Sequence, residues 1–168
     1  MKKIIIPVSI VIIAIIGFIL LLPNDDEKIR ATVKKGKEAV EEENLSKIMS
    51  IFSIEYRDRY GLPYGTIRGA FNDLFARSDN IQIHYTLAEV AIANDTSKVL
   101  MEVRAAGAVS GIRRDIVGDE DEAGRLELIL IKKYVKWLII SSEWKNPQAV
   151  KGIDAMPYIP HFNSPNTL

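Results

Sequence analysis

The hydrophobic pattern begins with a continuous apolar segment. The 19 residues from Ile4 to Leu22 carry no formal charge, and nine of them are isoleucine. As a helix this segment would be about 28 Å long, close to the hydrocarbon thickness of a bilayer. The length, and the lack of a small-residue cleavage site before Pro23, favour an uncleaved transmembrane anchor in residues 1–23, with a cleaved signal peptide as the alternative.

Charges on either side of this segment predict its orientation. Lys2 and Lys3 precede it, whereas Asp25, Asp26 and Glu27 follow it. Because positive charge is retained on the cytoplasmic side, we expect a single-pass protein with a cytoplasmic amino terminus. The rest of the chain would then be extracytoplasmic, either periplasmic or at the cell surface.

Three helices are predicted after the anchor, because apolar residues recur there at helical spacing. The first covers about residues 24–43, with Asn24 as its N-cap. The second covers 45–53 and the third 64–77. The third has the clearest pattern, with apolar residues at i, i+3, i+4, i+7 and i+8: Ile67, Ala70, Phe71, Leu74 and Phe75.

Beyond Asn80 the apolar period changes to two, which is typical of strands. Four strands are expected, with a bulge near Glu89 in the first and an acidic link, residues 115–122, before the third. Helices followed by antiparallel strands predict an α+β domain over residues 24–145. Residues 146–168 contain four of the seven prolines and are interpreted as an extended tail.

Composition narrows the chemistry. The chain has 22 basic and 22 acidic residues, no cysteine and two histidines. Balanced charge argues against nucleic-acid binding, which needs a basic surface. Without thiols there is no disulfide framework and no cysteine nucleophile. His84 and His161 have no neighbour at ligand spacing, so we expect no metal site, and no motif indicates a cofactor.

Three stretches of the chain resemble a known family. They are residues 27–40, residues 54–62 followed by 74–77, and residues 136–144. Together they resemble the SnoaL-like branch of the nuclear-transport-factor-2-like superfamily. The resemblance implies a curved antiparallel sheet wrapped by three helices into a cone, the cystatin-like arrangement. It also implies a cavity at the wide end and homodimers that form through the sheet.

Members of this superfamily include isomerases, hydratases, non-catalytic ligand binders and membrane-anchored assembly subunits, so the fold does not choose a function. Tyr56, Asp58 and Tyr60 are two residues apart, so in an extended segment their side chains would lie on the same side. A carboxylate beside a phenol could transfer a proton to and from a substrate bound in an apolar cone. The same stretch, with its alternating charges, also suits a surface edge with ion pairs. Both interpretations stay open.

The last strand predicts the remaining candidate residues. Strict alternation would place Glu143 on the same face as Trp137, and an interior carboxylate there would have a raised pKa. Exposure of Glu143 at an open end of the sheet is the alternative, and the one favoured. The other face, with Leu138, Ile140 and Trp144, is the candidate interface for a second subunit or the tail. The candidate ligand pocket comprises Tyr56, Asp58, Tyr60, Phe71, Phe75, Trp137 and Glu143.

The sequence therefore predicts a membrane-anchored extracytoplasmic domain that binds an envelope protein or a small apolar ligand without turnover. The alternative is an anchored isomerase or hydratase that uses Asp58 or Glu143 with Tyr56 or Tyr60. A carboxylate and a phenol converging on an open cavity would favour the enzyme. A cone filled by Phe71, Phe75 and Trp137 would argue against it.

Overall fold

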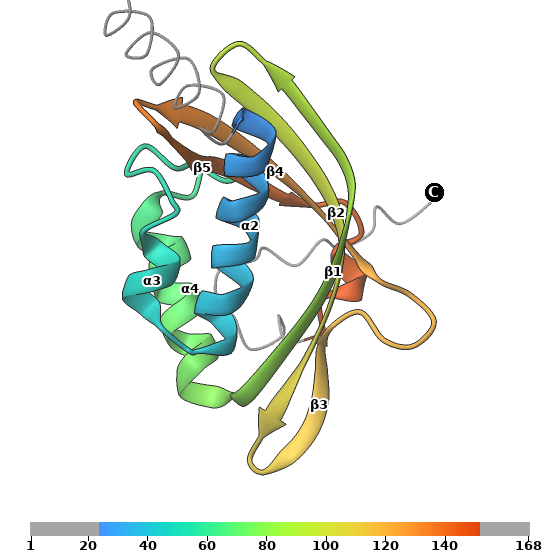
Figure 1. Ribbon diagram of the computed structural model, residues 1–168. Helices are drawn as coiled ribbons and strands as arrows, with labels where there is room; N and C mark the ends of the chain where they lie inside the picture. Colours follow the sequence, from blue (N-terminus) through green and yellow to red (C-terminus); the bar gives the residue numbers. More distant parts are fainter. Residues whose placement is uncertain (1–23, 152–168) are drawn as a thin grey trace, which may run out of the picture.

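Residues 24–151, the part of the chain that the computed structural model describes, form three α-helices and a five-stranded antiparallel sheet (Figure 1). The predicted α+β class is confirmed. The elements in chain order are α2 (Asp25–Glu41), α3 (Leu45–Met49), α4 (Tyr64–Arg77), β1 (Asp79–Ala93), β2 (Thr96–Val109), β3 (Ile112–Val117), β4 (Gly124–Lys133), β5 (Lys136–Trp144) and the 3-10 helix η1 (Pro147–Ala149).

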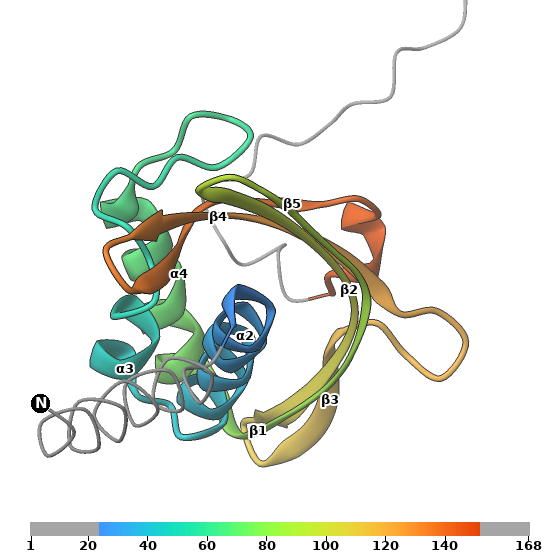
Figure 2. The same cartoon turned by 45° about the horizontal axis from the view of Figure 1, so that its top comes forward.

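The sheet is arranged around β2. The strand order is β1–β2–β4–β5, and β3 pairs with the end of β2 that β4 leaves free. The sheet curves around α2, with α3 and α4 beside it, as Figure 2 shows. Residues along β2 alternate between buried and exposed, because one face of the strand covers the core.

The start of α2 is fixed by a capping box. The Asn24 side chain accepts a hydrogen bond from the Glu27 backbone N–H at 2.8 Å, and the Glu27 carboxylate accepts one from the Asn24 N–H at 3.2 Å. These bonds satisfy two donors that a helix start would otherwise leave free. The apolar face of the helix, with Ile29, Val33 and Val40, is buried in the core.

A carboxylate attaches the first turn of α2 to the β4–β5 hairpin. Asp25 accepts hydrogen bonds from the Lys132 ammonium at 2.7 Å and from the Trp137 indole N–H at 3.2 Å. The hydrogen bond from Lys132, followed by that from Trp137, lowers the pKa of the Asp25 carboxyl. The buried indole of Trp137 thus has a partner for its only polar atom.

Carboxylates at the other end of α2 bind the edge of β1. Glu41 accepts a hydrogen bond from the Ile83 N–H, and Glu43, just beyond the helix, accepts one from the Asn80 N–H, both at 2.8 Å. An edge strand exposes unpaired N–H groups that can pair with another chain. The two glutamate carboxylates accept hydrogen bonds from two such N–H groups, and the same bonds hold α2 against β1.

The core is concentrated around α2, α3 and the inner face of the sheet. Its largest fully buried side chains are Trp137, Tyr56, Ile29, Leu130 and Val99. By contrast, α4 has no buried residue, although its apolar face packs on the core, and α3 is the element that it contacts most. The helix α4 is therefore an outer layer on the core rather than part of it.

Two elements differ from the sequence prediction. No strand is predicted at β3, whose last residues, 115–117, fall in the predicted acidic link, because Ile112-Arg113-Arg114-Asp115 lacks alternating apolar residues. It forms because the Ser110-Gly111 turn folds the chain back onto β2. The second helix ends at Met49 rather than at residue 53, because Ile51 and Ser53 instead pair with Ile139 of β5. The bulge predicted in β1 is confirmed between Leu87 and Glu89.

The folded region also continues past the predicted boundary at residue 145. Val150 forms an antiparallel bridge with Val117, and the Lys151 N–H donates to the Ile116 carbonyl at 2.9 Å. Residues 1–23, which contain the predicted anchor, and the rest of the predicted tail lie outside the described residues. Within residues 24–151, no helix has the length and apolar character needed to cross a membrane.

Two glycines make a matched stability test of this packing. A Cβ on Gly124 would lie 2.5 Å from a Val117 methyl carbon and 3.0 Å from the Trp144 ring, whereas one on Gly69 in α4 would meet nothing within 4 Å. We expect Gly124→Ala to lower the free energy of unfolding by about 1–3 kcal/mol through overpacking. Gly69→Ala should raise it by about 0.5–1 kcal/mol. Urea denaturation of the full chain in mild detergent measures both, and equal effects would contradict the packing described.

Candidate functional site

Tyr56 is the predicted site residue that lies deepest in the protein. Only 1% of it is exposed, and its hydroxyl lies 2.6 Å from the Ser142 hydroxyl on β5. Its ring packs edge-on against Phe52, with centroids 5.2 Å apart. Burial raises the pKa of the Tyr56 phenol to about 12, although the Ser142 hydrogen bond opposes this. The phenol therefore stays protonated at neutral pH and is a hydrogen-bonding group rather than a base.

No hydrogen bond joins Asp58 or Tyr60 to the Tyr56 hydroxyl, although the Asp58 charge contributes to raising the pKa of Tyr56. The Asp58 carboxylate accepts hydrogen bonds from the backbone N–H groups of Tyr60 at 2.8 Å and Leu62 at 2.7 Å. These bonds close the loop between α3 and α4, the usual role of an aspartate in a tight turn. Tyr60 is 52% exposed. The structure thus assigns this carboxylate a structural contact in the loop.

A bulge in β5 changes which residues of that strand face the core. Leu130 pairs with Ile139 but Ile129 pairs with Ser141, so Ile140 is an extra residue on β5. Beyond it Leu128 pairs with Ser142. Because an inserted residue reverses the alternation, Ser142 shares the concave face with Ile139.

This bulge exchanges the predicted positions of Glu143 and Trp144. Trp144 pairs with Leu126 on the concave face, and its ring lies over Gly124. Glu143 pairs with Glu127 on the opposite, convex face. The prediction that side chains alternate through the whole strand is therefore wrong beyond Ile140. It placed Glu143 on the face of Trp137 and Trp144 on the face of Leu138.

On the convex face Glu143 belongs to a cluster of ion pairs. It accepts a hydrogen bond from Lys145 at 2.7 Å and contacts the Arg59 guanidinium. Lys145 also lies 3.1 Å from the Glu127 carboxylate. The hydrogen bond from Lys145, with a further contribution from Arg59, holds the pKa of Glu143 below its usual value. The carboxyl is thus ionised at neutral pH, opposite to what a proton donor there would require.

Partly buried apolar side chains on the concave side form the remaining candidate site. Phe71 on α4 lies between Phe52 and Phe75, with ring centroids 6.0 Å from each. We call the partly buried rings of Phe71 and Phe75, which lie beside the buried ring of Phe52, the concave apolar surface. Trp137 is fully buried and fills the core beside it, so it is not available to a ligand.

The predicted interface residues are divided between the two faces. Leu138 pairs with Ile131 on the convex face and is partly buried there, as is Ile131. Ile140 is the bulge residue, and its carbonyl accepts a hydrogen bond from the Arg57 N–H at 2.9 Å. Trp144 lies on the concave face. Of the three, Leu138 is the one that pairs in regular register on the convex face.

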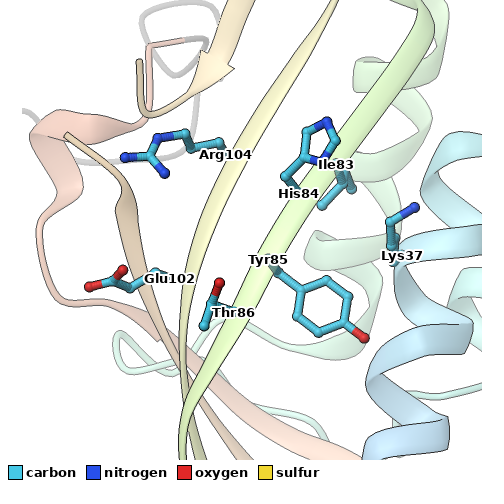
Figure 3. A pocket seen from close by; sticks show the side chains of 7 residues that line it. All are labelled: Lys37, Ile83, His84, Tyr85, Thr86, Glu102 and Arg104. Atoms are coloured by element: carbon cyan, nitrogen blue, oxygen red, sulfur yellow. The ribbon is translucent and has the colours of Figure 1, made fainter. Parts of the chain in front are cut away.

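A separate polar hollow of about 360 Å³ lies at the edge of β1 (Figure 3). Its lining residues are Lys37, Ile83, His84, Tyr85, Thr86, Glu102 and Arg104. Its cationic groups are already engaged: Lys37 binds Glu41 at 2.5 Å, and the Arg104 side chain donates to the Asp119 carbonyl at 2.7 Å. Across residues 24–151, no three histidine, aspartate or glutamate side chains are grouped to hold a metal ion.

Comparison with solved structures supports the resemblance at the level of fold. A nuclear-transport-factor-2-like family protein from Streptomyces avermitilis matches 69% of this chain and 91% of its own, with TM-score 0.58 and 14% identity. A ketosteroid isomerase-like protein from Erwinia carotovora matches 68% and 90%, with TM-score 0.55 and 11% identity. The structural overlap shows that the domain has the nuclear-transport-factor-2-like fold, and at such low identities it shows the fold alone.

Another similar structure is Bd1075 of Bdellovibrio bacteriovorus, with TM-score 0.57 and 16% identity. The match covers 69% of this chain but only 38% of Bd1075, so this chain corresponds to part of that protein. No family model and no curated protein matches the sequence.

Ser142 was not among the predicted site residues, although it bonds the Tyr56 hydroxyl. The sequence shows only two adjacent serines after an apolar run, and regular alternation would select Ser141 for the interior. Which of the two serines faces the core depends on the register between β5 and β4, and this register cannot be inferred from the residues of β5 alone.

The buried phenol predicts a specific alkaline response. Because the folded-state pKa of Tyr56 is raised, its stabilising contribution is complete below about pH 10 and is lost as pH rises through about 12. Tyr56→Phe should cost about 0.5–1.5 kcal/mol at neutral pH through the lost hydrogen bond. The variant should also lose less stability than the wild type over that alkaline range. Denaturation midpoints measured across it test this, and parallel curves would contradict it.

Proposed function

We propose that this protein is a membrane-anchored domain that binds a partner protein or a small apolar ligand at the concave apolar surface without turnover. The observation that carries the proposal is α4: its aromatic side chains face the core, yet none of its residues is buried. Partly exposed aromatic side chains beside an apolar core are suited to an apolar occupant.

The state of the candidate carboxylates also supports binding over catalysis. Asp58 caps backbone N–H groups of its own loop, and Glu143 is ion-paired on the convex face. A proton-transfer mechanism needs a carboxylate within hydrogen-bond reach of the substrate carbon or oxygen. Neither carboxylate bonds to Tyr56, whose hydroxyl is paired with Ser142. The anchored isomerase or hydratase therefore remains the weaker alternative.

The extracytoplasmic location and the homodimer are further parts of the proposal. Residues 4–22 are long and apolar enough to span a bilayer as one helix, with the domain on the side away from Lys2 and Lys3. The convex face, with Leu138 and Ile131 partly exposed, offers apolar surface for a second copy. A monomer by light scattering at high protein concentration would contradict the dimer.

The binding proposal is tested with a photocrosslinking amino acid. Phe75→benzoylphenylalanine, in the full chain expressed in its native membranes, places the reactive ketone on the concave apolar surface. We expect one dominant adduct after irradiation, either a protein band or a ligand-sized mass shift. A matched probe at Thr86, an exposed position on β1, should give none of it. The same adduct from both positions would contradict binding at this surface.

Two substitutions on α4 distinguish an effect of charge at the binding site from an effect of charge on the helix as a whole. Phe75→Asp places a charge among the partly buried aromatic rings and should reduce the adduct formed by a probe at Phe71 at least about tenfold. Asn72→Asp adds the same charge on the exposed face of α4 and should leave that adduct unchanged. Equal losses would mean that the charge acts on the helix rather than on the site.

The anchor has its own test. Alkaline carbonate should leave the full-length protein in the membrane pellet, because a spanning helix is held by its apolar length rather than by surface charge. Release of the full-length protein into the supernatant would contradict the anchor.

A further inference from the structure

Exposed apolar side chains gather at one end of the domain. We define the N-terminal end face by the start of α2 at Asn24, the β1–β2 turn, the β4–β5 turn and the segment 54–55. Among the described residues, six large hydrophobic side chains are exposed, and four of them belong to this face: Tyr134 at 97%, Ile54 at 76%, Val135 at 71% and Ile92 at 42%. Figure 1 shows these turns beside the start of α2.

Hydrogen bonds and ion pairs join the parts of this face. The Lys132 N–H donates to the Asp95 carbonyl at 2.8 Å, which links the two hairpin turns. Lys133 forms an ion pair with Glu55 at 2.9 Å, next to Ile54. Lys132 also binds Asp25, one residue after Asn24. The exposed side chains therefore lie around the point at which the chain enters the domain.

The residues of the β4–β5 turn are unusual for their position. The domain has three two-residue hairpin turns, and each begins with a residue of positive φ. Asn94-Asp95 and Ser110-Gly111 are small or polar, as such turns prefer. The third is Tyr134-Val135, with φ of 58° at Tyr134. A bulky residue in the left-handed region is strained, so folding alone does not favour this pair.

The position of this face relative to the anchor follows from chain length. Only Pro23 separates Leu22, the end of the apolar segment, from Asn24. Two residues span at most about 7 Å. A headgroup layer is about 5–8 Å thick on each side of the hydrocarbon. If residues 4–22 span the bilayer, Asn24 must lie in or directly beside the headgroups, and the end face must lie against them.

We propose that the Tyr134-Val135 turn, with Ile54, inserts into the interfacial layer of the bilayer and fixes the orientation of the domain on the membrane. This inference rests on the membrane anchor of the proposed function. An exposed tyrosine beside aliphatic residues suits the interface, where the ring is apolar and the hydroxyl stays hydrated. The exposed Lys136 follows the turn directly, as a lysine does when its stem lies in the interface and its ammonium group in the headgroups.

The charges of the end face indicate which lipid it needs. Lys132 and Lys133 are paired with Asp25 and Glu55, and further acidic residues, Asp26 and Glu27, are close in sequence to Asp25. The face is therefore not a basic patch for anionic lipid. Contact depends instead on the exposed apolar area, and phosphatidylcholine alone should suffice.

The absence of cysteine makes a direct test possible. The full chain carrying Val135→Cys, labelled with the fluorophore NBD, is reconstituted into phosphatidylcholine vesicles with nitroxide on the lipid acyl chains. Ile112→Cys is the matched control, because Ile112 is 59% exposed beside the two-residue β2–β3 turn at the far end of β2. We expect about half of the emission to be quenched at 135 and less than about a tenth at 112.

Equal quenching at the two positions would overturn the proposal. So would blue-shifted emission at 135 without lipid quenching, because that would indicate contact with protein, such as a second copy. Carbonate extraction of the same vesicles distinguishes the failures. Retained protein with an unquenched label at 135 would refute the insertion alone, whereas released protein would refute the anchor and, with it, the insertion.

A double variant tests the turn without endangering the fold. Y134N/V135G replaces the pair with residues that a two-residue hairpin prefers, so the thermal midpoint should be unchanged or higher. With the label at Ile54→Cys, this variant should show about two- to threefold less lipid quenching than the same label with the native turn. Unchanged quenching at 54 with an intact fold would show that the turn does not hold the domain on the bilayer.

Discussion

The fold depends on α2 being held in the concave face of the sheet by carboxylates near both of its ends. Asp25 binds the β4–β5 hairpin, while Glu41 and Glu43 bind N–H groups at the edge of β1. The two attachment points lie on opposite edges of the sheet, because the strand order runs from β1 to β5. One helix thus closes the curvature of the whole sheet. The apolar face of α2 could not do this alone, since hydrophobic contact is not directional.

Local periodicity explains which elements the sequence predicted well. The third helix was located at its observed bounds, residues 64–77, because its apolar spacing is regular over two turns. The first helix was located by Asn24 and the acidic residues after it. β3 was missed because its pairing with β2 is set by a turn and a neighbouring strand rather than by its own side chains. Such partners are absent from any local pattern.

The candidate site was harder to predict because one inserted residue decides its chemistry. Up to Ile139, alternation from Trp137 gives the correct faces. After Ile140 the same rule gives the wrong face for every residue, and it exchanges an indole and a carboxylate between the core and the solvent. The extra residue is accommodated by pairing with the loop after α3, which reaches β5 at Ile139 and Ile140. Tyr56 was predicted as a site residue, but its hydroxyl partner depends on this register.

The position of α4 outside the buried core has a consequence for how a bound molecule would enter and leave the domain. An element with no buried residue and few contacts beyond α3 has a small free energy of local opening compared with that of the whole domain. None of the buried core residues belongs to α4, so the core around Trp137 and Leu130 can stay intact during such an opening. The occupant proposed for the concave apolar surface would therefore enter and leave by displacement of one helix. Its residence time would be set by that local motion, while the rest of the domain stays folded.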